Sequence, residues 1–260
     1  HGQLPELSWS VRAVADGQLK EIPFELTEQP DHNLAPAMSG TDGCYIYFTS
    51  GSTGVPKAIF GNHRGIRHFI DWEIAEFKVT NKDHTTQFAA VVFDAFQRDV
   101  FVPLCSGATL CIPPKDVKEN ILHLISWIEE KEISLIHCVP SLFKAITKVL
   151  EGEAPDDTRF KRLKNVLMAG EPLFGKDVQR WRDVTSDRIE VVNMWGTSET
   201  TMAKTFHRTK ELPADPGRVL HVGQPLPDTV VAISNPLNEL CAVGEIGELH
   251  IRTIYASNGY

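Results

Sequence analysis

The feature that most constrains the fold of this 260-residue chain is a regular alternation of short apolar runs with amphipathic segments. The amphipathic segments carry apolar residues at helical spacing, as Ile66, Phe69 and Ile70 do within residues 64–77. The apolar runs between them have the length and residue types of buried strands. Strands that alternate with helices at this spacing predict an α/β fold, with a mostly parallel sheet flanked by helices on both faces.

The expected elements follow one another along most of the chain. Strands are expected at residues 44–48, 58–60, 85–93, 108–113, 133–139, 164–170 and 188–195. Helices are expected at residues 64–77, 119–132, 141–150 and 175–184, and a further amphipathic segment ends at residue 104. Three regions are therefore predicted: an irregular lead-in at 1–43, an α/β core at 44–205, and the start of a β-rich subdomain, broken by Gly and Pro, at 206–260.

Charge and cysteine content argue against several classes of function. The formal net charge of −8 disfavours a nucleic-acid surface, because phosphate binding needs clustered Lys and Arg. No apolar run approaches the roughly 20 residues that span a bilayer, and no signal-peptide pattern is visible. The five cysteines are odd in number and lack metal-ligand spacing, which indicates reduced, mostly buried thiols in a cytoplasmic protein.

The segment TSGSTGVPK at residues 49–57 follows directly on a run that reads as a buried strand. Its glycines allow close backbone approach, its hydroxyl and N–H groups can surround phosphate oxygens, and Lys57 supplies a cation. The spacing differs from that of a Walker A loop. Because ligands bind outside the carboxyl ends of parallel strands, we expect a phosphate site here. The alternative is a surface loop that is merely rich in small residues.

Five segments, in this order, resemble the motifs of the adenylate-forming superfamily: YFTSGSTGVPKAI, FDAFQRDVF, AGEPL, NMWGTSETT and GEIGELHIRTIYASNGY. From about Cys44 to Tyr260 the chain is similar to the central part of an adenylation domain of a nonribosomal peptide synthetase. It is also similar to the adenylation domain of aminoadipate reductase. The resemblance implies that ATP, with Mg²⁺, and a carboxylic acid give an acyl-adenylate and pyrophosphate. It further implies transfer of the acyl group to the phosphopantetheine thiol of a carrier protein.

The resemblance also assigns the ATP site. Phosphate contacts are implied for Thr49, Ser50, Ser52, Thr53, Lys57 and Ser198. Adenine contacts are implied for Gly170, Glu171 and Trp195, and Gly51, Gly54 and Gly196 are further expected cofactor-binding residues. Glu199 matches the magnesium-binding carboxylate, and with Lys57 it is an expected catalytic residue that acts by positioning and charge neutralisation. We expect these two residues to converge at one edge of the sheet. Thr197 and Ser198 depart from the family, which usually has Pro and Thr there.

Asp94 takes the place of the family's aspartate that binds the α-ammonium group of an amino acid. The other pocket positions align with Ala95, Arg98, His137, Leu167, Ala169, Met194, Met202 and Ala203. Arg98 is informative, because a buried guanidinium is costly without an anionic partner. Asp94, Arg98 and His137 together resemble pockets for acidic amino acids such as glutamate, β-methylaspartate and aminoadipate. Without the motif, Arg98 reads as a helix-surface residue paired with Asp99 or Glu132, and His137 and the two methionines read as core.

Two alternatives stay open. An acyl- or aryl-acid CoA ligase of the same superfamily shares the ATP motifs, although Asp94 argues against it because such acids carry no amine. The other is a non-catalytic remnant or scaffold segment of a synthetase. The family's ribose-binding motif, its mobile C-terminal subdomain and most of its N-terminal third are not found, so we expect an excised core that is nearly inert alone. The expected partners are the amino acid, a carrier domain and the rest of the synthetase.

Overall fold

The computed structural model describes residues 10–15, 18–23, 37–49, 55–152 and 158–260. The chain divides into two compact units, His1–Met38 and Ser39–Tyr260, and each is described by itself. In the first unit, β1 (Ser10–Ala15) pairs antiparallel with β2 (Gln18–Pro23). The prediction of an irregular lead-in is therefore wrong for these residues, whose hydrogen bonds are those of a regular hairpin. The predicted division of the remaining chain into a core and a β-rich segment stays a prediction.

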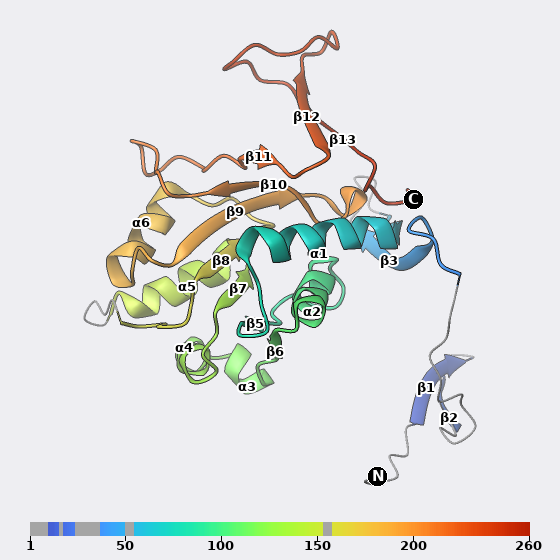
Figure 1. Ribbon diagram of the computed structural model, residues 1–260, viewed down its shortest axis with the longest axis horizontal. Coiled ribbons are helices and arrows are strands. Elements are labelled where there is room, and N and C mark those ends of the chain that lie inside the picture. Colours follow the sequence, from blue (N-terminus) through green and yellow to red (C-terminus); the bar gives the residue numbers. More distant parts are fainter. Residues whose placement is uncertain (1–9, 16–17, 24–36, 50–54, 153–157) are drawn as a thin grey trace. The chain divides into compact units, whose positions relative to one another are not determined.

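A seven-stranded mixed sheet forms the centre of the second unit (Figure 1). Its strands are, in spatial order, β11 (Gln224–Pro225), β10 (Ala203–Arg208), β9 (Glu190–Gly196), β8 (Asn165–Met168), β7 (Leu135–Cys138), β5 (His84–Thr86) and β6 (Thr109–Cys111). The strands from β9 to β6 are parallel, whereas β10 is antiparallel to both of its neighbours. The predicted α/β fold with a mostly parallel sheet is confirmed.

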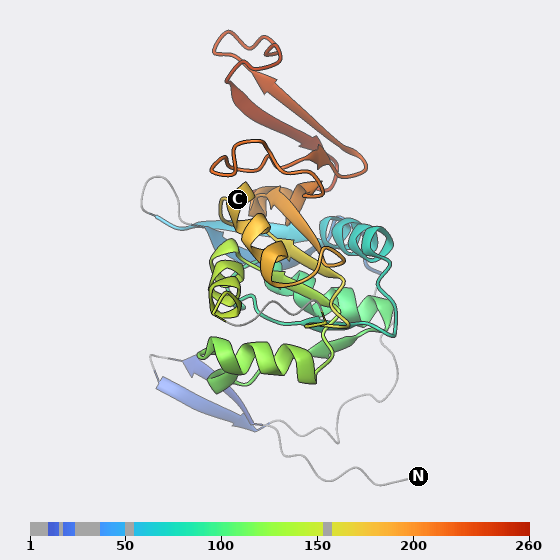
Figure 2. The ribbon, with the colours of Figure 1, turned by 90° about the vertical axis from the view of Figure 1, so that its left-hand side faces the viewer.

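Helices cover both faces of this sheet. One face carries α4 (Ile121–Glu130), α5 (Pro140–Leu150) and α6 (Gly175–Val184), the other carries α1 (His63–Phe77) and α2 (Ala95–Ser106), and the short α3 (Lys115–Lys118) precedes α4. Neighbouring strand residues serve opposite faces, because side chains alternate along a strand. In β7, for example, Ile136 packs with α4 to α6 and Leu135 packs with α1 and α2. Figure 2 shows the sheet between α1 and α5.

Two antiparallel hairpins lie outside the seven-stranded sheet: β3 (Gly43–Thr49) with β4 (Lys57–Asn62), and β12 (Thr229–Ser234) with β13 (Glu248–Thr253). The expectation that residues 49–57 leave the carboxyl end of a buried parallel strand is therefore wrong. They instead connect the two strands of a hairpin. The apolar run of β3 is also not buried, since Phe48 is 67% exposed.

The apolar run at residues 85–93 forms a strand only at its start, which corrects the predicted strand. β5 ends at Thr86, and the backbone then turns toward the side chain of Asp99. The Asp99 Oδ2 atom accepts hydrogen bonds from the backbone N–H groups of Phe88 at 3.0 Å and Ala89 at 2.9 Å. These donors are therefore satisfied without a neighbouring strand, and the ladder stops.

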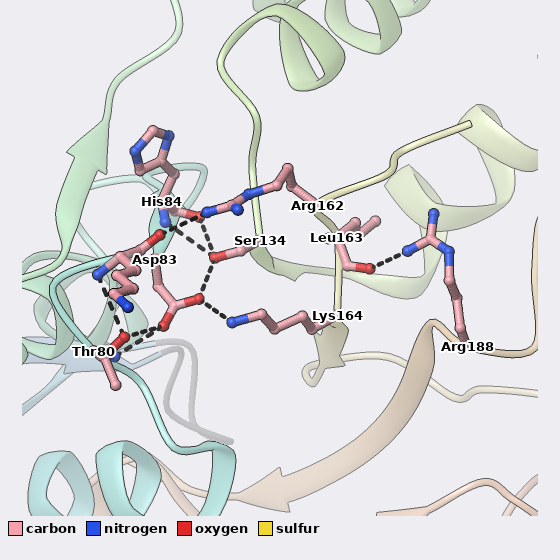
Figure 3. Close-up of polar contacts among 9 residues, drawn as sticks. Thr80, Asp83, His84, Ser134, Arg162, Leu163, Lys164 and Arg188 are labelled. Atoms are coloured by element: carbon pink, nitrogen blue, oxygen red, sulfur yellow. Dashed lines mark hydrogen bonds and ion pairs between the residues drawn. The ribbon is translucent and has the colours of Figure 1, made fainter. Parts of the chain in front are cut away.

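A polar network joins the amino ends of three parallel strands (Figure 3). Asp83, Ser134 and Lys164 directly precede β5, β7 and β8. The Asp83 Oδ1 atom accepts from Ser134 Oγ at 2.8 Å and Lys164 Nζ at 2.6 Å, and Oδ2 accepts from the backbone N–H and hydroxyl of Thr80. Burial raises the pKa of Asp83, but these bonds outweigh it and hold the pKa below its usual 3.8. The network lies at the edge of the sheet opposite the candidate site and serves to hold the strands together.

The structure tests the expectations that the cysteines are mostly buried and that the chain has no membrane-spanning segment. All five cysteines are free, but only Cys138 is buried, whereas Cys44 and Cys105 are exposed. The expectation of mostly buried thiols is therefore wrong. In the part of the chain that the structure describes, no helix combines the length and apolar character needed to cross a membrane.

Candidate functional site

Lys57 and Glu199 come together at Tyr260, beside the end of β9. The Tyr260 hydroxyl donates to Glu199 Oε1 at 2.8 Å, and the Lys57 ammonium lies 4.9 Å from the centre of the Tyr260 ring. Burial raises the pKa of Glu199, but the Tyr260 hydrogen bond, backbone and Thr197 hydrogen bonds and the Lys57 charge outweigh it, so the pKa lies below 4.5. The structure thus brings the two expected catalytic residues to one place. Tyr260 ends the last of the five motifs but was not predicted as a site residue.

The C-terminal segment that carries Tyr260 is fixed on both sides. Ser257 donates its backbone N–H to the Glu199 carbonyl at 2.9 Å, and Asn258 donates to the Phe60 carbonyl of β4 at 2.7 Å. The Asn62 side chain, which also caps the start of α1, donates to Asn258 Oδ1 at 2.8 Å. The hairpin that holds Lys57 and the turn that holds Glu199 are therefore linked through backbone hydrogen bonds.

The predicted phosphate-binding segment at residues 49–57, called the phosphate loop below, is described only at its ends. Ser50, Gly51, Ser52, Thr53 and Gly54 lie outside the described residues. Thr49 and Lys57 are paired as the last residue of β3 and the first of β4. Ser198 begins the 3-10 turn η2 (Ser198–Thr200), directly after β9, and its carbonyl accepts from Thr201 N–H at 3.2 Å. The predicted cofactor-binding roles of all these residues stay predictions.

The donor set at Glu199 fits magnesium. Mg²⁺ is usually held by one or two carboxylates together with substrate phosphate oxygens and water. Glu199 offers one ionised, partly exposed carboxylate next to the end of the phosphate loop. The described residues contain no group of three or more His, Cys, Asp or Glu that could hold a metal by itself.

Two of the predicted adenine contacts follow β8. Gly170 has φ +92°, a left-handed conformation that favours glycine, and it is exposed. The Glu171 carboxylate accepts from the backbone N–H and the hydroxyl of Ser141, both at 2.8 Å, at the start of α5. The Glu171 side chain thus holds the loop to α5.

Two further predicted cofactor-binding residues, Trp195 and Gly196, lie at the end of the neighbouring strand β9. Trp195 is half-buried. A Cβ on Gly196 would lie 2.1 Å from the Met202 carbonyl oxygen, so only glycine fits this close approach. Because β8 and β9 are adjacent and parallel, their carboxyl ends present these residues at the same edge as Glu199.

Asp94 links the start of α2 to the start of β10. Its side chain makes no capping hydrogen bond at the start of α2, which begins with Ala95. Its Oδ2 atom instead accepts from the Met202 backbone N–H at 3.1 Å, and its Oδ1 atom has no hydrogen-bond partner among the described residues. Thr201 and Met202 both have positive φ, +64° and +58°, and form the bend that aims this N–H at Asp94.

The predicted apolar pocket residues are brought together by the sheet. They are Leu167, Ala169, Met194, Met202 and Ala203. Four of them are buried between the sheet and helices α1 and α2, and Ala169 packs against that cluster. Leu167 lies opposite His137 in the register of β8 and β7, so this apolar group adjoins the polar part of the predicted pocket. The role of these residues in binding a substrate stays a prediction.

Four charged side chains are buried in series between α1, α2 and β7. Glu73 Oε1 lies 2.7 Å from His137 Nε2, and His137 Nδ1 lies 3.3 Å from Asp99 Oδ1. The same Asp99 oxygen is 3.5 Å from Arg98 Nε. Arg98 is only 6% exposed, so the interpretation of Arg98 as a helix-surface residue is wrong, although Asp99 is its neighbour.

The charges in this series perturb one another. Burial and the Arg98 charge each lower the pKa of His137, but the carboxylates of Glu73 and Asp99 outweigh them, so the pKa lies above 6.5. Burial raises the pKa of Asp99, but the close contact with His137 and the Arg98 charge outweigh it, so the pKa lies below 3.8. Within the described residues the Arg98 guanidinium makes no hydrogen bond, and its Nε is buried without an acceptor.

Sequence reasoning missed Glu73 and the burial of Asp99. A signal for Glu73 was present, because it shares one face of α1 with Phe69, Ile70 and Phe77, where an acid is out of place. Asp99 carried no such signal, since its partners Phe88 and Ala89 are fixed only by the tertiary structure. Glu73 and Asp99 thus both contact His137, a residue of the predicted pocket, from within the core.

Lys204 is a second buried charge that the motifs did not indicate. It is fully buried on β10, with its ammonium nitrogen 3.5 Å from His68 Nδ1 and no ion pair among the described residues. Burial lowers the pKa of Lys204 to about 8, and the Asp94 charge acts in the opposite direction. His68 in turn stacks on Tyr255, with ring centres 3.8 Å apart.

Comparison with known proteins agrees with the resemblance predicted from the motifs. The family model described as AMP-binding enzyme matches residues 2–260. Tyrocidine synthase 3 of Brevibacillus parabrevis is 32% identical over 228 residues, which is 88% of this chain and 3% of that protein. The L-2-aminoadipate reductase large subunit of Eremothecium gossypii is 27% identical over 267 residues, 100% of this chain and 18% of that protein. The chain thus spans less than a fifth of either relative.

Solved structures share the fold. The N-terminal subdomain of Klebsiella oxytoca NpsA, in complex with 3-hydroxybenzoyl-AMSN, has a TM-score of 0.75 at 24% identity and covers 90% of this chain and 57% of that chain. The nonribosomal peptide synthetase FmoA3, in its form bound to α-methyl-L-serine-AMP, has a TM-score of 0.78 at 24% identity, covering 87% of this chain and 25% of that one.

Proposed function

This chain belongs to the AMP-binding enzyme family, and we propose that it activates the carboxylate of an amino acid by joining it to ATP. An oxygen of the amino-acid carboxylate bonds to the α-phosphorus of ATP, and the bond from that phosphorus to the bridging β-phosphate oxygen breaks, which releases pyrophosphate. The Lys57 ammonium neutralises phosphate charge, and the Glu199 carboxylate would hold a magnesium ion, which would supply further positive charge to the phosphates. The observation that carries this proposal is the convergence of Lys57 and Glu199 at Tyr260.

The position of Asp94 favours an amino acid over a simple acid. Its Oδ2 atom is held by the Met202 backbone N–H, and its Oδ1 atom is left without a partner among the described residues. A substrate ammonium group supplies the missing donor and the opposite charge. An acyl or aryl acid would leave this carboxylate unpaired.

Arg98 favours an acidic side chain. The Arg98 Nε is buried without a hydrogen-bond acceptor among the described residues, and its ion pair with Asp99 is 3.5 Å long. A substrate carboxylate would supply two acceptors in a geometry that matches the guanidinium fork. We therefore propose a substrate with a second carboxylate: aspartate, or a methylated or one-carbon-longer relative. A protonated His137, next to Asp99, adds a second cationic group to this part of the proposed pocket.

Two further steps belong to this proposal. The thiol of a carrier-bound phosphopantetheine attacks the acyl carbon, a thioester forms, and AMP leaves. One of the solved relatives is described as an artificially fused adenylation–PCP di-domain, which supports a carrier domain as partner. The five free thiols are compatible with the reducing cytoplasm, where we place the activity.

Pyrophosphate exchange by the full-length protein tests the substrate. The panel contains the common amino acids, aminoadipate, β-methylaspartate and, for the CoA-ligase alternative, aliphatic and aryl acids such as 3-hydroxybenzoate. Exchange that depends on an acidic amino acid supports the proposal, and exchange with acids that lack an amine favours the alternative. If no acid supports pyrophosphate exchange, the remaining interpretation is a non-catalytic remnant or scaffold segment of a synthetase. The expectation that the 260 residues alone are nearly inert stays a prediction, which the same assay on the chain by itself tests.

Variants of the proposed residues sharpen this test. Arg98→Ala removes one partner of a buried charge pair, which typically costs about 2–5 kcal/mol, or roughly 30- to 3,000-fold in kcat/KM for the acidic substrate. Arg67→Ala, at an exposed arginine of α1, is the matched control and should leave kcat/KM unchanged. Lys57→Ala and Glu199→Gln should lower kcat for every substrate, because both act on phosphate charge. An equal loss of kcat/KM for acidic and neutral substrates in Arg98→Ala would contradict the role of Arg98 in substrate choice.

A further inference from the structure

The buried series Glu73, His137, Asp99, Arg98 alternates in charge along its length. Each neighbouring pair is in close contact. Glu73 Oε1 lies 2.7 Å from His137 Nε2, and Asp99 Oδ1 lies 3.3 Å from His137 Nδ1 and 3.5 Å from Arg98 Nε. The two carboxylates balance the guanidinium and a charged imidazole. The series therefore adds no net charge to the core when His137 is protonated.

Asp99 is shared by several donors. Its Oδ2 atom accepts two backbone N–H groups, and its Oδ1 atom faces both His137 and Arg98. A charged His137 therefore takes part of the attraction that Asp99 would otherwise exert on Arg98. With a neutral His137, the Asp99 charge would be balanced by Arg98 alone, and a substrate carboxylate would have to compete with it.

Glu73 decides which of these two situations holds. It contacts His137 on the side away from Asp99, and both side chains are fully buried. A carboxylate at 2.7 Å from one ring nitrogen favours the doubly protonated imidazole. The other oxygen of Glu73, Oε2, is buried without a hydrogen-bond partner among the described residues, so His137 is the partner that they offer this carboxylate.

We propose that Glu73 is a positioning residue for substrate choice: by holding His137 in its charged form, it leaves the Arg98 guanidinium available to the side-chain carboxylate of an acidic substrate. This inference rests on the proposed function and deepens it. Glu73 touches neither ATP nor the amino acid in this scheme, and it acts only through His137 and Asp99.

The proposal makes substrate choice depend on pH. The charged and titratable groups that face His137 are Glu73 from α1 and Arg98 and Asp99 from α2. The adjoining Cys138 on β7 stays neutral, because burial raises its pKa to about 12. The pKa of His137 lies above its usual 6.5, so preference for the acidic substrate is present below this raised pKa and falls as the pH rises through it. Without the Glu73 charge, the fall occurs at lower pH.

The experiment compares kcat/KM for aspartate with that for asparagine, and glutamate with glutamine, in pyrophosphate exchange by the full-length protein from pH 6 to 9. Glu73→Gln should lower the acidic-to-neutral ratio at pH 7 by about tenfold, a typical size for coupling between two sites. It should also move the pH at which preference is lost to lower values. Glu73→Asp should restore part of the ratio, and Glu119→Gln, at an exposed acid of similar chemistry, should change nothing.

Three outcomes overturn the proposal. The first is an unchanged ratio and pH profile in Glu73→Gln, and the second is an equal loss for acidic and neutral substrates, which indicates a purely structural role. If Glu73→Gln does not fold, the pH titration of the His137 ring-proton NMR signal in the wild-type protein decides instead. This signal is assigned with His137→Asn, and a His137 pKa that is not raised above 6.5 is the third outcome. A wild-type protein without acidic preference would refute the proposed substrate class itself, which is a different result from a wild-type preference that Glu73→Gln leaves intact.

Discussion

Replacing the buried Lys204 by methionine is expected to stabilise the protein at neutral pH. Lys204 is fully buried on β10, and no carboxylate forms an ion pair with it in the described part of the chain. An ammonium group taken out of water without a partner is unfavourable. Methionine keeps an unbranched apolar side chain of similar length and removes the charge, so the surrounding packing should change little.

The pKa of Lys204 sets the size of this effect. It falls from the usual 10.5 to about 8, because burial outweighs the attraction of Asp94. One pH unit between folded and unfolded pKa values corresponds to about 1.4 kcal/mol, so the charged lysine destabilises the folded state by roughly 3 kcal/mol below pH 8. The folded state binds fewer protons than the unfolded state between about pH 8 and 10.5. The cost therefore decreases as the pH rises through this window and is absent above it.

Urea unfolding, followed by tryptophan fluorescence at pH 7, 8.5 and 10, measures this difference. Lys204→Met should raise the free energy of unfolding by about 2–3 kcal/mol at pH 7, and the gain should shrink steadily toward pH 10. Lys144→Met, at an exposed lysine of α5, is the control and should have no comparable effect. A variant that is less stable than wild type at pH 7, or a gain that does not change with pH, would refute this reasoning.

Three other outcomes are expected. Gly223→Ala should lower the free energy of unfolding by more than about 2 kcal/mol, because Gly223 has φ +80° and a Cβ there would lie 1.8 Å from the Phe206 carbonyl oxygen; a neutral effect in urea unfolding would count against the geometry. Asp83→Asn should destabilise by about 1–3 kcal/mol at pH 7, since it weakens hydrogen bonds to a buried carboxylate. Because the pKa of Asp83 is lowered, this contribution is present above pH 3.8 and should disappear as the pH falls through the folded value, which unfolding at pH 3 and pH 7 checks. In thiol titration of the native protein, Cys44 and Cys105 should react before Cys138, which is buried and has a pKa of about 12; early reaction of Cys138 would contradict its burial.

The fold class and the family could be predicted from the sequence because both depend on local patterns. Helical spacing in residues 64–77 predicts a helix, and the structure has α1 at His63–Phe77. Apolar runs at residues 133–139 and 164–170 predict strands, and the structure has β7 and β8 within them. The motifs also placed Lys57 and Glu199 in the same site, and the structure joins them through Tyr260.

Errors in the predicted elements arose where partners distant in sequence replace local pairing. The run at residues 85–93 has strand composition, but Asp99 binds the backbone of Phe88 and Ala89 and ends the ladder. The run before the phosphate loop also has strand composition, yet within the described residues it pairs with β4 in a separate two-stranded sheet outside the central one. Composition reports that a segment can form a strand, whereas the partner that it pairs with is chosen by the whole fold.

The sequence by itself determined the sheet with its covering helices, the order of the motifs and the residue types available to the site. Only the tertiary structure decided which charges are buried together. Arg98 and Asp99 adjoin in sequence, but Glu73 and His137 come from α1 and β7, and Lys204 from β10. The physical reason is that hydrophobic periodicity acts between residues a few positions apart. The state of a buried charge depends instead on every group within a few ångströms, and packing brings those groups from distant parts of the chain.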